Sequence, residues 1–72
     1  MNLLELKSQM VRHGDNQKDL AEVLGVTPTT MSMKLQGKAP FKLHEANLIA
    51  ERYGLDDEQV RLIFFDEKNL GW

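Results

Sequence analysis

The sequence predicts a compact all-α domain of five short helices. Apolar residues recur at intervals of three and four, which is the spacing of one helix face. Each of four apolar runs is followed by a glycine, where a helix is expected to end. A chain of 72 residues is long enough for one domain only. The predicted helices span about residues 2–13, 17–24, 28–36, 43–53 and 57–65, with a tail at 66–72.

The composition excludes several classes of protein. The chain has no cysteine, so it can form neither a disulfide nor a thiolate metal site, which suits a reducing cytoplasm. No apolar run approaches the ~20 residues of a membrane span. Residues 1–6 lack the basic segment and apolar run of a secretory signal. We therefore expect a cytoplasmic protein that does not enter a membrane.

The residues also argue against an enzyme. There is no glycine-rich phosphate loop and no HExxH motif, and His13 and His44 lie far apart in the sequence. The acidic residues at 56–58 are explained by helix capping. So small an all-helical domain leaves little room for a pocket. We expect no catalysis, no cofactor, no metal site and no small-molecule ligand.

The first predicted helix, 2–13, begins at a capping residue. Asn2 can accept a hydrogen bond from a free backbone amide, with Glu5 as the reciprocal partner three residues on. Leu3, Leu6 and Met10 then share one apolar face. His13 at the far end is interpreted as a solvent-facing side chain, in preference to a metal ligand.

The helix at 17–24 and the turn after it have strong local signals. Asn16 and Asp19 have the spacing of a capping box. Gly25 ends the helix, because glycine takes the left-handed turn without a Cβ penalty. The apolar face consists of Leu20, Ala21, Val23 and Leu24.

The next helix, 28–36, presents two different faces. Thr27 can cap it, and Pro28 fits the first turn, where no backbone amide is needed. Met31 and Leu35 lie on one face, four residues apart. The opposite face carries Thr29, Ser32, Met33 and Gln36.

Residues 16–37 resemble the helix-turn-helix of the lambda-repressor-like (Cro and phage repressor, XRE-type) family. The matching residues are Gln17, Leu20, Ala21, Gly25, Val26, Met31 and Gly37. The stretch KLQGKAPFKLHEANLIAERYGLDDEQVRLIFF is similar to the second half of short phage and prophage regulators, so the resemblance covers roughly residues 3–66. It implies one DNA-binding domain over residues 1–72, in a bacterial cytoplasm. It also implies a homodimer that represses transcription by blocking polymerase at a two-fold, double-stranded DNA operator.

In such a motif the second helix lies in the major groove, with side chains at base edges. The candidates for base contact are Thr29, Ser32, Met33 and Gln36. Hydroxyls can donate to or accept from several bases, and a Thr methyl or a Met can meet a thymine methyl. Gln36 can reach an adenine edge or a phosphate. Related regulators often carry Arg where Met33 stands, so Met33 either contacts DNA through apolar atoms or faces a protein.

The charge distribution locates a candidate phosphate-binding surface. The net charge is −2, yet no acidic residue lies between Glu22 and Glu45. The candidates for phosphate contact are Gln17, Thr27, Lys34, Lys38, Lys42 and His44. Gln17 begins a helix, where free backbone amides favour binding of an anion. The resemblance implies that a Gln at this position braces both the DNA phosphate backbone and the recognition helix. The alternatives are that the lysines keep a loop soluble, Gln17 is an ordinary first-turn residue and His44 a neutral surface side chain.

The last two predicted helices differ in how they begin. Lys42 is a poor cap for the helix at 43–53, whose start is expected to fray until a phosphate binds, and Phe41 is expected to plug the core before it. Asp56 is a good cap for the helix at 57–65. That helix is apolar over more than one stripe, which often marks an interface. The candidates for a dimer interface are Ile63, Phe64, Phe65, Leu70 and Trp72; the alternative is a single core with one exposed Phe.

A second function remains open beside the first. The same fold can serve as a protein-binding module, such as an antirepressor or an adaptor. The net negative charge, Met33 and the apolar helix at 57–65 favour this alternative. Loss of DNA affinity in Lys34→Ala with the fold intact is expected to separate the two.

Overall fold

The computed structural model describes residues 1–65, and within them every regular element is a helix. The five helices are α1 (Leu3–Arg12), α2 (Gln17–Leu24), α3 (Pro28–Leu35), α4 (Leu43–Tyr53) and α5 (Asp57–Phe64). The all-α prediction is therefore confirmed, and each predicted helix end lies within one residue of the observed one. Leu70 and Trp72 lie outside the described residues. No helix in the described part of the chain is long and apolar enough to cross a membrane.

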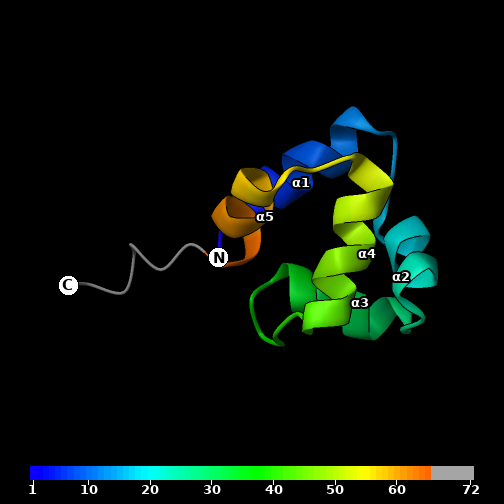
Figure 1. Ribbon diagram of the computed structural model, residues 1–72. Helices are drawn as coiled ribbons and strands as arrows, with labels where there is room; N and C mark the ends of the chain where they lie inside the picture. Colours follow the sequence, from blue (N-terminus) through cyan, green and yellow to red (C-terminus); the bar gives the residue numbers. More distant parts are fainter. Residues whose placement is uncertain (66–72) are drawn as a thin grey trace.

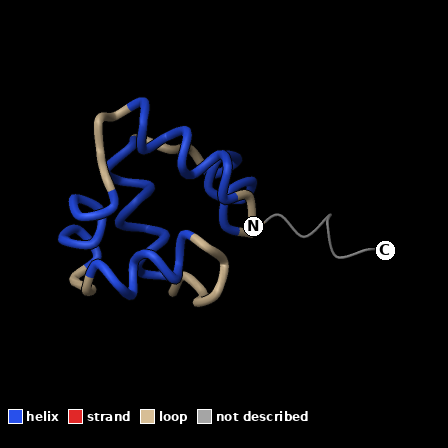
Figure 2. Tube along the Cα trace, turned by 180° about the vertical axis from the view of Figure 1, so that it is seen from behind, coloured by secondary structure: helices blue, strands red, loops and turns tan. Residues whose placement is uncertain are grey.

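The helices are arranged around α4. In Figure 1, α1 and α5 lie at one end of the molecule, α2 and α3 lie at the other, and α4 runs between them. The packing agrees with this view, because α1 contacts α5, α2 contacts α3, and α4 contacts both α2 and α5. Figure 2 shows the same arrangement from behind, with short loops joining the helices. Residues 36–42, between α3 and α4, form the longest of these loops.

One core receives a side chain from every helix. The largest side chains with no more than a trace of exposure come one from each helix: Leu6, Leu20, Met31, Ile49 and Ile63. Full burial of a Leu, Ile or Met is worth about 1.5–3 kcal/mol relative to exposure. Loss of any one helix would thus expose part of the core built by the other four, so the five helices are expected to fold together.

Three helices, α2, α3 and α5, begin as their predicted caps indicate. Oδ1 of Asn16 accepts from the amide of Asp19 at 2.8 Å, and Oδ2 of Asp19 accepts from the amide of Asn16 at 3.0 Å. Asp56 and Gln59 make the same reciprocal pair at the start of α5. Thr27 Oγ1 accepts from the amide of Thr30 at 3.1 Å. These bonds satisfy amides that have no partner within the helix.

The starts of α1 and α4 differ from the prediction. Oδ1 of Asn2 accepts from the amide of Glu5 as expected, but the Asn2 amide donates to the Ile63 carbonyl at 2.8 Å and not to Glu5. This bond attaches the start of α1 to α5. At α4 the Lys42 side chain caps nothing, yet the Lys42 amide donates to Glu45 Oε1 at 2.8 Å. The start of α4 is therefore held by a carboxylate from its own first turn, in place of the cap that the Lys42 side chain does not supply.

Candidate nucleic-acid interface

The turn between α2 and α3 sets the direction of α3. Gly25 has a φ of 69°, a left-handed conformation that an L side chain rarely adopts. The amide of Val26 donates to the Ala21 carbonyl at 3.0 Å and closes the end of α2. Ala21 is 1% exposed, and so small a side chain allows close approach where α2 packs on α3. The turn and this packing hold α3 with Met31 and Leu35 inward.

The outer face of α3 carries the four predicted base-contact residues. Thr29, Met33 and Gln36 are exposed, and Ser32 is half-buried. Nε2 of Gln36 donates to Oγ of Ser32 at 2.8 Å. The structure thus brings these four side chains onto one accessible surface, opposite the buried Met31 and Leu35.

Gln17 connects the starts of the two helices. Its Nε2 donates to the carbonyl of Pro28, the first residue of α3, at 2.9 Å. The side chain remains exposed, and its Oε1 and second N–H are left for another partner. The hydrogen bond fixes the N-terminal end of α3 relative to that of α2. The bracing of the second helix expected for Gln17 is therefore present as a direct contact.

Lys34 departs from its predicted role. Its ammonium lies 2.8 Å from Glu45 Oε1 and 2.8 Å from the Pro40 carbonyl, and the residue is 4% exposed. It also lies 5.5 Å from the centre of the Phe41 ring. A buried ammonium with an anionic partner is not available to a phosphate. The prediction of a phosphate contact by Lys34 is wrong, because the loop at residues 36–42 returns the start of α4, and with it Glu45, to the end of α3.

The pair with Lys34 also determines the ionisation of Glu45. Burial acts to raise the pKa of Glu45, but the hydrogen bonds from Lys34 and from the Lys42 amide outweigh it. The pKa is consequently held below its ordinary value. Glu45 is therefore a carboxylate at neutral pH, and its pair with Lys34 holds the loop between α3 and α4 against the core.

The remaining predicted phosphate contacts lie on the surface. Lys38 and Lys42 are exposed on the loop that Lys34 holds, and His44 is exposed in the first turn of α4. The amide of Lys38 donates to the Met33 carbonyl at 2.9 Å, so the loop leaves α3 in a defined direction. Thr27 is exposed too, with its hydroxyl 3.0 Å from that of Thr30. Two lysines with accessible ammonium groups thus follow α3 directly.

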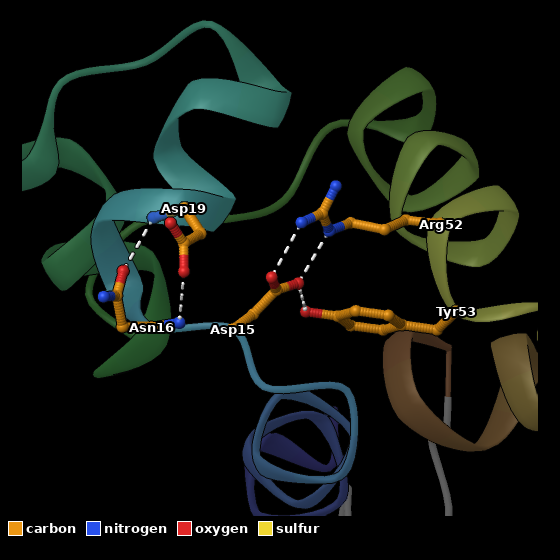
Figure 3. A network of polar contacts seen from close by, with 5 residues as sticks. All are labelled: Asp15, Asn16, Asp19, Arg52 and Tyr53. Atoms are coloured by element: carbon orange, nitrogen blue, oxygen red, sulfur yellow. Dashed lines mark hydrogen bonds and ion pairs between the residues drawn. The ribbon is translucent and has the colours of Figure 1, made fainter.

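A polar network at the other end of α4 was not predicted. Figure 3 shows Asp15, in the link between α1 and α2, facing Arg52 and Tyr53 of α4. Arg52 donates to both carboxylate oxygens, at 2.6 and 2.7 Å, and the Tyr53 hydroxyl donates to Oδ2 at 2.7 Å. His13 stacks on the Tyr53 ring with a centroid separation of 4.6 Å. No local pattern could have indicated these contacts, because Asp15 and Arg52 are 37 residues apart.

Asp15 is ionised within this network. The hydrogen bond from Arg52 lowers the pKa of Asp15 most, burial opposes it, and the Tyr53 hydroxyl lowers it further, to about 2. Burial and the neighbouring carboxylate raise the pKa of Tyr53 above its ordinary value. Tyr53 therefore remains a hydrogen-bond donor, and the network attaches the α1–α2 link to α4.

The predicted dimer interface divides into buried and exposed residues. Ile63 is 0% exposed and Phe64 is 7% exposed, so both belong to the core of the domain. Their assignment to an interface is wrong, because α1 and α4 cover the face of α5 that carries them. Phe65, directly after α5, is 49% exposed, and Leu62 on the helix is 42% exposed. These two side chains are the apolar surface that α5 leaves uncovered.

Among the described residues no group of three or more His, Cys, Asp or Glu is placed to hold a metal ion. No family model, no curated protein and no solved structure matches the chain. The assignment of function therefore rests on the geometry of α2, α3 and the loop that follows.

Proposed function

We propose that this chain is a sequence-specific DNA-binding regulator of transcription. In this proposal α2 and α3 form a helix-turn-helix of the lambda-repressor-like kind, and α3 enters the major groove. The observation that carries it is the outer face of α3, where exposed hydrogen-bonding side chains lie opposite a buried anchor and Gln17 fixes the start of the helix. A helix that reads base edges needs such an accessible face on a rigid support.

The charges near α3 support the same proposal. Lys38 and Lys42 have exposed positions on the loop after α3, and their ammonium groups are suited to phosphates on either side of a groove. Gln17 at the start of α2 and His44 at the start of α4 stand where free amides and the helix dipole favour an anion. Acidic side chains gather farther along the chain, at residues 51 and 56–58.

The proposed regulator binds as a homodimer in a bacterial cytoplasm, as the resemblance to phage and prophage regulators implies. Two copies of α3 would lie about 34 Å apart, one turn of DNA. Phe65 and Leu62 supply an exposed apolar surface for the contact between copies. Repression follows from occupation of a site that polymerase needs.

Selection from a pool of random duplexes at two salt concentrations tests the proposal. We expect a near-palindromic motif with half-sites about 10 base pairs apart. Retention without a motif, lost as salt rises, would reduce the activity to electrostatic contact and contradict the proposal. A second pool, selected with Gln36→Ala, should lose part of the motif while the protein stays folded, because Gln36 is exposed.

The second candidate is a protein-binding module on this fold, as in an antirepressor or an adaptor. Three exposed apolar side chains favour it, since Met33 and Leu62 are each 42% exposed and Phe65 is 49% exposed. Met suits adaptable protein contacts. Absence of any duplex retention at low salt, with stable capture of a second protein that Met33→Gln abolishes, would select this function over the first.

A further inference from the structure

The outer face of α3 combines an amide, hydroxyls and a thioether. Gln36, Thr29 and Met33 are exposed there, and Ser32 is half-buried beside Gln36. The one cation on the helix, Lys34, points the other way and is held 2.8 Å from Glu45. The chemistry that α3 itself can offer to a base edge is therefore neutral.

The hydrogen-bonding groups that remain on Gln36 complement one kind of base edge. Its Nε2 donates one hydrogen to Ser32 Oγ at 2.8 Å, which leaves one N–H and the Oε1 acceptor. Adenine presents an acceptor, N7, beside a donor, N6–H₂, and a donor–acceptor pair complements it. Guanine presents two acceptors, N7 and O6, and needs two donors. The remaining groups of Gln36 thus match adenine and mismatch guanine.

Met33 offers apolar contact at a fixed place. Its side chain is 42% exposed, although its backbone is well anchored, since the carbonyl accepts from the amides of Lys38 and Ala39. Contact with the 5-methyl group of thymine would remove apolar surface of both partners from water. No other base presents a methyl group in the major groove.

We infer that the half-site read by α3 consists of A·T base pairs, with a thymine methyl against Met33 and an adenine edge on Gln36. This inference rests on the proposed function and names the DNA that the same site selects. The exposed Lys38 follows α3 closely and is a cation that could read guanine, but we assign it to phosphate.

Modified bases test each contact separately. Binding is measured by fluorescence anisotropy at one salt concentration, on the duplex that wild type selects. Each thymine is replaced in turn by uracil, which deletes only the methyl group, and each adenine by 7-deazaadenine, which deletes only N7. For wild type we expect one uracil position to weaken binding about fourfold. We expect one 7-deazaadenine position to weaken it roughly tenfold.

Variants link each loss to its side chain. Met33→Gln should abolish the effect of uracil and keep that of 7-deazaadenine, and Gln36→Ala should do the reverse. Val11→Gln is the matched control, because Val11 is 80% exposed on α1. For Val11→Gln, the uracil and the 7-deazaadenine substitutions should each weaken binding as they do for wild type. Both Met33 and Gln36 are exposed, so these variants are expected to fold.

Other outcomes separate this inference from the proposed function. A selected motif with guanines at its central positions overturns the inference but not the proposed function. The same holds for a motif whose preference for guanine is lost when the protein carries Lys38→Gln. Wild-type binding that is indifferent to both modified bases also overturns it. A pool that yields no motif overturns the proposed function, and the inference with it.

Discussion

The ammonium of Lys34 and the carboxylate of Glu45 form an ion pair inside the domain. Nζ lies 2.8 Å from Oε1, with only 5% and 3% of the two side chains exposed. The carboxylate also accepts from the Lys42 amide, and the ammonium donates to the Pro40 carbonyl. The pair thus joins the end of α3 to the start of α4 and determines where the loop between them, residues 36–42, lies.

Removal of one partner from this pair should be costly. Lys34→Ala leaves Glu45 buried without its cation, for which we expect a loss of about 3–5 kcal/mol in the free energy of unfolding. Urea denaturation measures it, with Lys38→Ala as the control, since Lys38 is exposed. The double variant Lys34→Met, Glu45→Leu leaves no buried charge without a partner. Its loss in the free energy of unfolding should be smaller than the sum of the losses for Lys34→Met alone and Glu45→Leu alone. Equal urea midpoints for Lys34→Ala and Lys38→Ala would contradict the buried pair.

Asp15 should make stability fall in acid. Its pKa is lowered from 3.8 to about 2 in the folded protein, so folding favours the ionised carboxylate. This contribution is complete above about pH 4 and is lost as the pH falls towards 2. Because 40% of the Arg52 side chain is exposed, water screens the pair, and we expect only about 1 kcal/mol.

The comparison of wild type with Asp15→Asn measures this effect. The difference in free energy of unfolding should be largest near neutral pH and should shrink as the pH falls below about 4. Glu51→Gln, which replaces an exposed carboxylate on α4 by an amide, is the control for the substitution itself. A difference between wild type and Asp15→Asn that is independent of pH would rule out the charge of Asp15 as its source.

Lys38 should contribute to DNA affinity through charge alone. On the selected duplex, Lys38→Ala should weaken binding to all sequences alike and reduce the slope of log K against log salt by about 1. Lys7→Ala removes the same charge from an exposed position on α1 and is the matched control. If the slope of log K against log salt is the same for wild type and Lys38→Ala, Lys38 does not contact a phosphate.

Gln17 should act through the position of α3. Its hydrogen bond to the Pro28 carbonyl is exposed, so Gln17→Ala should cost at most about 1 kcal/mol of stability. Binding to the selected duplex should weaken severalfold with an unchanged salt slope, because no charge is lost. Anisotropy titrations at three salt concentrations measure both quantities. Unaltered affinity would show that α3 needs no such brace.

Ile63 in α5 and Phe65, at the C-terminal end of that helix, have opposite surroundings. Ile63→Ala opens a cavity in the core and should cost about 2–5 kcal/mol, whereas Phe65→Ser alters a side chain that is 49% exposed and should change stability little. If Phe65 contacts a second copy, Phe65→Ser should raise the dimer dissociation constant in sedimentation equilibrium. A dimer that is unaffected by Phe65→Ser would place the contact between copies elsewhere.

Features that depend on neighbours in the sequence were predictable. The caps at Asn16, Thr27 and Asp56 and the helix end at Gly25 follow from residues within three or four positions of each other. A cap bond or a left-handed turn closes over so few residues that the rest of the chain has little influence on it. The apolar spacing likewise identified the inner faces of α1, α2 and α3, but on α5 it left the buried Ile63 and Phe64 assigned to an interface.

Features that depend on which helix packs against which could not be predicted from the sequence. Lys34 has the sequence context of a free lysine, and its partner Glu45 is 11 residues away across a loop. Asp15 meets Arg52 only because α4 returns past the α1–α2 link. The direction of a helix after a loop depends on the packing of the whole core, which no local pattern encodes. The sequence by itself thus determined the helices and most of their inner faces, whereas the tertiary structure decided which side of α5 is buried and which polar side chains remain free for a partner.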